Sequence, residues 1–142
     1  MSKAKTEKTP LATRTFQLAT CDVMTFVATR EARKSRKFYE ETLGLRFISD
    51  EPYALVFDLN GIMLRIQKVQ DLTPAQHTIL GWSVPNIREA VKALAARGVL
   101  FQRYPGMQQD ELGVWTSPSG GQVAWFRDPD GNTLSLTQFV QP

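Results

Sequence analysis

The chain has few of the side chains from which proteins build disulfides and metal sites. Its 142 residues include one cysteine, Cys21, and one histidine, His77. A single cysteine excludes an intrachain disulfide and a zinc site built from cysteine thiolates. Because no disulfide framework is possible, a cytoplasmic location is the default expectation.

An excess of one charge and long apolar runs are also missing. The net charge is only +3, and no apolar run is long enough to cross a bilayer. Residues 1–15 contain lysines with no apolar run behind them, which predicts a polar, disordered tail rather than a secretion signal. Residues 30–37 gather much of the positive charge, but pairs such as Arg36 and Glu40 fit a solvated helix face better than a nucleic-acid patch. We therefore expect neither nucleic acid nor a membrane as a partner.

One sequence pattern occurs twice. Residues 57–69 read FDLNGIMLRIQKV, and residues 126–139 read FRDPDGNTLSLTQF. Each has an acidic residue, a turn with glycine, and then apolar residues at every second position. When Gly61 is aligned with Gly131, leucine falls on leucine three residues later. An internal repeat of this kind indicates one supersecondary unit that needs a second copy to bury its apolar face.

The sequence of each half predicts one strand, then one helix, and then three more strands. In the first half a helix is expected over residues 31–43, and Asn60-Gly61 predicts a hairpin. In the second half Asn86 is expected to cap a helix, with Glu89 as its capping-box partner. Strands follow at residues 99–104 and 121–128.

These elements predict an α+β fold in one domain, residues 16–142, with modules at about 22–70 and 77–139. Two such modules would form a curved sheet with helices on its outer face and a concave inner face. Side chains alternate between the faces of a strand, so Leu134 and Leu136 are expected to face the helices. The residues between them then face the concavity.

Three stretches resemble the vicinal oxygen chelate superfamily, which includes glyoxalase I, bleomycin-resistance proteins and extradiol dioxygenases. They are SRKFYEETLGL at residues 35–45, the helix ending in Arg97-Gly98, and RDPDGNTLSL at residues 127–136. The resemblance covers roughly residues 23–139. It implies two paired βαβββ modules that form an open, U-shaped barrel with a central pocket, commonly assembled as a homodimer.

Enzymes of that superfamily bind a divalent metal in the concavity, through the first and last strands of each module. The corresponding positions in this sequence are Met24, Arg65, Ile79 and Ser135. None of these is a good ligand for a catalytic divalent cation, and the cationic Arg65 would repel one. We therefore predict no metal and no other cofactor, while a displaced metal site with His77 and Asp22 stays open as the minor alternative.

The predicted concave face joins an apolar floor to a few polar groups, which is typical of a small-molecule pocket. Its expected members are Met24, Phe26, Met63, Arg65, Gln67, Ile79, Gly81, Thr133 and Ser135. Gly81 would leave room in mid-strand for a ligand. Arg65 has two interpretations: it receives an anionic group of the ligand, or it forms an internal ion pair with an acid such as Asp22 or Glu111.

Aromatic residues lie in the long loop at residues 105–121 and in the strand after it. Trp115 and Trp125 could form a wall on which a ligand stacks, or they could belong to the core or a dimer contact. Trp82 is expected to face the helices instead. The loop itself is either a lid over the pocket or an ordinary connection.

The leading hypothesis is a metal-free protein that binds a small organic molecule, partly aromatic and carrying an anionic group, as a resistance-type binder or carrier. A central arginine and a positive chain argue against a cationic ligand. The alternative is a metal-dependent lyase, isomerase or dioxygenase with displaced ligands, whose catalytic residues the sequence does not identify. A pure protein-interaction role is the third possibility.

Overall fold

The first module begins with a strand rich in β-branched and aromatic residues, as expected for a half-buried strand. The computed structural model describes residues 15–141. The first elements are a short 3-10 helix η2 (Leu18–Thr20), β1 (Met24–Thr29), α1 (Ala32–Lys37), a π-helical turn η3 (Phe38–Thr42), β2 (Arg46–Asp50), β3 (Ala54–Leu59) and β4 (Ile62–Lys68). Their strands form sheet A in the order β1-β4-β3-β2, with β1 parallel to β4.

The second module repeats this arrangement. Its elements are β5 (Leu80–Ser83), α2 (Ile87–Ala96), β6 (Trp115–Thr116), β7 (Gln122–Arg127) and β8 (Thr133–Gln138). They form sheet B in the order β5-β8-β7-β6, with β5 parallel to β8. The α+β fold of two βαβββ modules is therefore confirmed, and the barrel is open because the two sheets remain separate.

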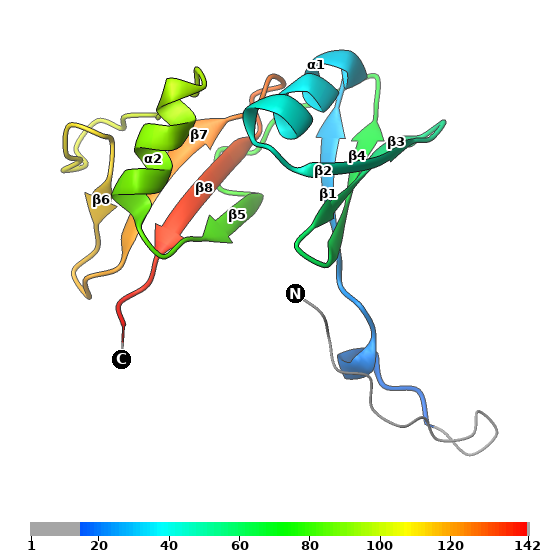
Figure 1. Ribbon diagram of the computed structural model, residues 1–142, viewed down its shortest axis with the longest axis horizontal. Coiled ribbons are helices and arrows are strands. Elements are labelled where there is room, and N and C mark those ends of the chain that lie inside the picture. The colour runs from blue at the N-terminus through cyan, green and yellow to red at the C-terminus, as the bar shows by residue number, and fades with distance from the viewer. Residues whose placement is uncertain (1–14, 142) are drawn as a thin grey trace.

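The hydrophobic core lies between the modules as well as within them. Figure 1 shows α1 between the two sheets, with α2 on sheet B. The ring of Tyr39 lies 6.1 Å from that of Phe57 on sheet A, and the ring of Phe38 lies 6.5 Å from that of Phe126 on sheet B. The helix after β1 therefore contacts the apolar faces of both sheets.

The junction of the modules is a buried polar cluster on the loop between β7 and β8. Asp128 accepts hydrogen bonds from the Tyr39 hydroxyl at 2.7 Å and from the Asn132 side chain at 2.9 Å. Asp130 accepts hydrogen bonds from the hydroxyls of Thr29 and Ser35. All six side chains are buried. This cluster fixes the second module against β1 and α1 of the first.

Backbone groups complete the junction. Asp130 also accepts a hydrogen bond from the backbone N–H of Arg30 at 2.9 Å, and Asn132 donates to the carbonyl of Ala28 at 2.8 Å. Gly131 has a φ of 91°, which L side chains rarely adopt, so the turn depends on glycine there. The DPDGN sequence thus has a clear structural role, whereas the matching hairpin at Asn60 in the first module is exposed.

The helix expected over residues 31–43 is shorter and irregular. Regular α-helix ends at Lys37, and a π-helical turn follows, in which Leu43 N–H donates to the carbonyl of Phe38. Periodicity alone could not show this, because a π-turn adds one residue per turn without changing composition. The expected cap of α2 is confirmed, since the Asn86 side chain accepts a hydrogen bond from the backbone N–H of Glu89 at 3.1 Å.

The prediction of a strand at residues 99–104 was wrong. That segment forms only an isolated bridge at Phe101, and the strand that follows α2 is β6, inside the predicted loop. The Gln109 side chain supplies the reason: it accepts from the N–H of Tyr104 and donates to the carbonyls of Gln102 and Gly113. An amide side chain thus replaces the hydrogen bonds of a strand ladder.

Residues 1–14 of the expected tail lie outside the described part of the chain. No helix within the described part is long and apolar enough to cross a membrane.

Candidate functional site

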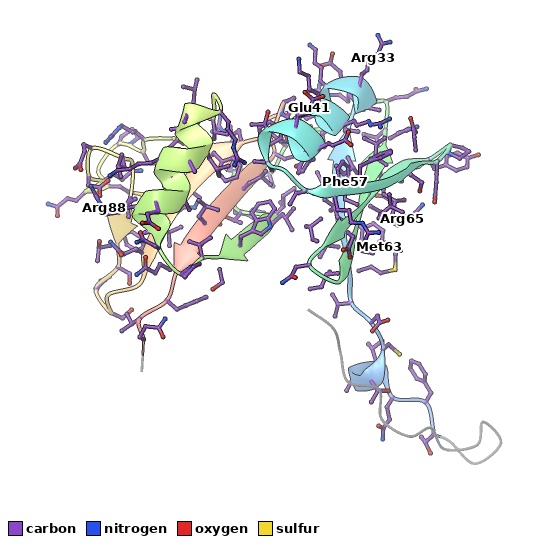
Figure 2. The ribbon with its side chains drawn as sticks, viewed as in Figure 1. Arg33, Glu41, Phe57, Met63, Arg65 and Arg88 are labelled. Atoms are coloured by element: carbon purple, nitrogen blue, oxygen red, sulfur yellow. The ribbon has the colours of Figure 1, made fainter. Side chains whose placement is uncertain are left out.

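Strand pleating places part of the predicted site on one face of sheet A. We call this the open face of sheet A, and it comprises Met24, Phe26, Ala28, Met63, Arg65 and Gln67. Met24 pairs with Met63 and Phe26 with Arg65 in the register of β1 and β4. Figure 2 shows Met63 and Arg65 next to each other on β4. The alternate residues Leu64 and Ile66 are fully buried in the core, as the sequence predicts.

The apolar side chains of this face are accessible. Met24, Phe26 and Met63 are 44%, 50% and 40% exposed. Three neighbouring large apolar side chains with this exposure form a surface that water covers in the isolated chain. Such surfaces indicate a contact with a ligand or with another protein.

Arg65 forms an ion pair within its own sheet. Its guanidinium lies 3.2 Å from a carboxylate oxygen of Glu51, and its side chain is 26% exposed. Glu51 is therefore the acidic partner in place of the suggested Asp22 or Glu111, and Glu111 pairs with Arg88. A guanidinium has five N–H donors, so Arg65 can pair with Glu51 and still donate to a ligand.

The aromatic part of the predicted site lies on sheet B. Trp125 is opposite Ser135 in the β7–β8 register, and Ser135 is opposite Gly81 in the β5–β8 register. The rings of Trp115 and Trp125 are 6.1 Å apart, and the ring of Tyr104 meets Trp125 edge to face at 5.6 Å. These half-buried rings, with Ser135 and Gly81, form what we call the open face of sheet B.

Other predicted members of the site are held by the protein itself. Thr133 is buried and donates a hydrogen bond to the carbonyl of Ala75. Ile79 is half-buried and packs against the core. A Cβ at Gly81 would lie 3.0 Å from the Ser135 hydroxyl, so the space expected beside this glycine is already occupied.

The structure thus divides the predicted site into two groups. Met24, Phe26, Met63, Arg65 and Gln67 share the open face of sheet A. Gly81, Ser135, Trp115 and Trp125 share that of sheet B. The two sheets share no strand pairing.

The four positions that the resemblance equates with metal ligands carry side chains whose donor chemistry does not fit a divalent cation. Met24 offers a thioether, Ile79 no donor, Ser135 a neutral hydroxyl, and Arg65 a positive charge. Within residues 15–141, no group of three or more His, Cys, Asp or Glu side chains could hold a metal ion. His77 is exposed on the segment before β5.

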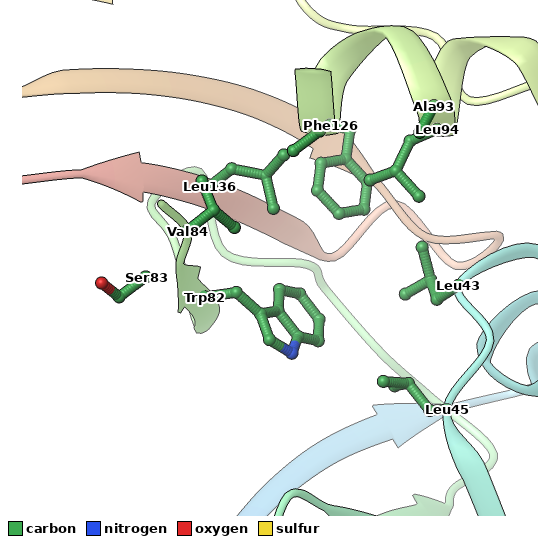
Figure 3. Close-up of a pocket in the computed structure, with 10 residues that line it drawn as sticks. Leu43, Leu45, Trp82, Ser83, Val84, Ala93, Leu94, Phe126 and Leu136 are labelled. Atoms are coloured by element: carbon green, nitrogen blue, oxygen red, sulfur yellow. The ribbon is translucent and has the colours of Figure 1, made fainter. Parts of the chain in front are cut away.

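Sequence reasoning missed an apolar groove on the helix side of sheet B. It has a volume of about 280 Å³ and is lined by Leu43, Leu45, Trp82, Val84, Leu94 and Leu136, among others. Figure 3 shows these side chains around a common space. The expected orientation of Trp82 toward the helices was the available signal, but the position of Leu43 and Leu45 depends on how the modules pack.

Comparison with known proteins identifies the family. The model of the Glyoxalase/Bleomycin resistance protein/Dioxygenase superfamily matches residues 20–136. The chain belongs to this superfamily. No curated protein is a significant match.

Solved structures with the same fold agree with this assignment. A lactoylglutathione lyase from Agrobacterium tumefaciens is similar, with a TM-score of 0.65 and 15% identity over 84% of this chain and 93% of that one. A superfamily member from Sphaerobacter thermophilus DSM 20745 has a TM-score of 0.66 and 23% identity over 86% of this chain and 100% of that one. At these identities the similarity shows the fold alone.

Proposed function

We propose that this superfamily member binds a small organic molecule without a metal, and that the ligand has an aromatic or apolar body and an anionic group. The strongest support comes from the side chains at the four positions that the resemblance equates with metal ligands, which are Met24, Ile79, Ser135 and Arg65. Met24 supplies exposed apolar surface, and Arg65 supplies a cation suited to a carboxylate or phosphate.

The two open faces fit different parts of such a ligand. The tryptophans of sheet B offer ring surface for stacking. Arg65 on sheet A offers charge, with Met24, Phe26 and Met63 as apolar surroundings. A second copy of the chain would cover the exposed face of sheet A and complete the pocket, so the proposed binding form is a homodimer.

Because Arg65 pairs with Glu51, substitutions at these two residues should have opposite effects on ligand binding, and together they test the proposal. Thermal unfolding is measured at increasing concentrations of an aromatic carboxylate such as 2-naphthoate. A ligand that binds the native state raises the midpoint temperature of unfolding by mass action. Arg65→Ala should weaken binding about tenfold or more, because a charge-assisted hydrogen bond is lost. Glu51→Gln should strengthen binding, because it removes the carboxylate that competes for the guanidinium.

Arg33→Ala is the matched control. Arg33 is an exposed arginine on α1, outside both open faces. Its loss should leave binding unchanged. The proposal is wrong if no aromatic carboxylate stabilises the protein, or if the Arg33 and Arg65 variants behave alike.

A further inference from the structure

The segment that leads into β1 carries two exposed, large apolar side chains. Phe16 and Leu18 are 77% and 75% exposed. Figure 1 shows this segment extending away from both modules, with η2 part-way along it. We call residues 15–21 the arm. Their sequence, TFQLATC, contains no charged side chain.

The residue between the two apolar side chains is extended. Gln17 has φ −135° and ψ 112°, in the β region. Side chains two residues apart along extended backbone point to the same side. Phe16 and Leu18 therefore form a short apolar strip on a neutral segment, and water covers it in the isolated chain.

The apolar groove beside β5 has the complementary properties. The side chains around it are leucine, valine, alanine, phenylalanine and tryptophan, with Ser83 as the one hydroxyl, and none is charged. Its volume of about 280 Å³ suits one or two large side chains. Like the arm, it presents apolar surface to water.

The strand edges indicate how an arm could reach the groove of another molecule. The arm leads directly into β1, and β1 is an edge strand of sheet A. The groove includes Trp82 and Ser83 of β5, which is an edge strand of sheet B. If β1 of one copy lies along β5 of another, the arm of the first lies beside the groove of the second. Edge strands readily make such contacts.

We infer that the arm docks in the apolar groove of a second copy, with Phe16 and Leu18 as the inserted side chains. This inference shares with the proposed function only the second copy. The arm would then act as a clasp that holds the dimer together outside the ligand pocket.

Cysteine chemistry tests the contact directly, because the single cysteine of the chain lies on the arm and is exposed. Chains carrying Cys21→Ser and Ser83→Cys, distinguished by an affinity tag, are mixed with wild-type chains and treated with a short bismaleimide. A covalent heterodimer is expected. The control replaces Ser119 by Cys in the same Cys21→Ser background; Ser119 is an exposed serine in the turn before β7, at the opposite edge of sheet B. It should give little product.

Two further variants complete the test. Phe16→Ala with Leu18→Ala should lower the heterodimer yield and weaken dimerisation about tenfold or more, since two large apolar side chains are no longer buried. A chain with both Cys21 and Ser83→Cys shows whether cross-linking occurs within one molecule.

Several results would overturn the inference: no product at Ser83→Cys, equal products at Ser83→Cys and Ser119→Cys, or cross-linking within single chains. Ligand binding is measured separately on the Phe16→Ala, Leu18→Ala variant. Loss of the clasp alone leaves the binding of aromatic carboxylates detectable at high protein concentration, whereas failure of the proposed function abolishes that binding in wild-type protein as well.

Discussion

Asp128 and Asp130 are two residues apart, yet their environments shift their acidities in opposite directions. Burial raises the pKa of Asp128, and its hydrogen bonds from Asn132 and Tyr39 only partly oppose this. Burial acts on Asp130 as well, but hydrogen bonds from Thr29, Arg30 and Ser35 outweigh it and lower the pKa. The pKa of Tyr39 is raised well above its usual range by burial and by the charge of Asp128, so its hydroxyl remains a donor.

Asp130→Asn should therefore destabilise the protein in a pH-dependent way. A carboxyl whose folded pKa is depressed stabilises the fold above its unfolded pKa of about 3.9, and this contribution is lost as the pH falls through the folded pKa. The variant should lose about 2 kcal/mol or more of unfolding free energy at pH 7, and the difference from wild type should shrink below about pH 4. The pKa of Asp128 is shifted in the opposite direction, but Asp128 is present in both the variant and the wild type.

Urea unfolding at pH 7, 5, 4 and 3 measures this difference, with Asp71→Asn as the control because Asp71 is exposed. A difference that stays constant from pH 7 to pH 3 would show that the charge of Asp130 does not stabilise the junction.

Among the elements, β5 leaves little room for a side chain at Gly81, where it pairs with β8. A Cβ on Gly81 would lie 3.0 Å from the Ser135 hydroxyl and 3.2 Å from its carbonyl oxygen. The hydroxyl can rotate away, but the carbonyl is fixed by the strand. Gly81→Ala should therefore cost about 1 to 3 kcal/mol of unfolding free energy, as overpacking usually does.

A double-mutant cycle with Ser135→Ala separates the two contacts. The cost of Gly81→Ala should be smaller in the Ser135→Ala background, because only the carbonyl contact remains. An equal cost in both backgrounds, or a gain in stability from Gly81→Ala, would contradict the packing explanation for this glycine.

The elements also show how far the sequence alone could be interpreted. Strict alternation in β4 and β8 predicted correctly which side chains enter the core, because pleating depends only on sequence position. The sequence could not exclude a strand at residues 99–104. The hydrogen bonds that replace a strand pairing there come from the side chain of Gln109, five residues beyond Tyr104. Likewise no local pattern encodes the π-turn after Lys37, in which Tyr39 and Phe38 lie against different sheets.

The same limit applies to the candidate site. The sequence identified Arg65 and both of its possible roles, but not Glu51, which a β-bulge in β2 and the following turn bring to it. The sequence did not predict the apolar groove either, because its two sides come from different modules.

The whole molecule combines a buried, hydrogen-bonded junction with two uncovered surfaces. The DPDGN cluster fixes one module on the other, while the open face of sheet A and the arm present apolar side chains to water. Both surfaces lie outside the shared core. In the proposed homodimer a second copy would cover both, and the proposed ligand pocket would then depend on assembly as well as on the fold of one chain.

Under the proposed function, the pocket binds an organic anion through Arg65 and needs no metal. A calorimetric titration tests this best, with the aromatic carboxylate that stabilises the protein most, performed in EDTA and again with added divalent cation. We expect saturable binding of equal affinity in both conditions, and its loss in Arg65→Ala. Binding that occurs only when divalent cation is added would show that a metal is required.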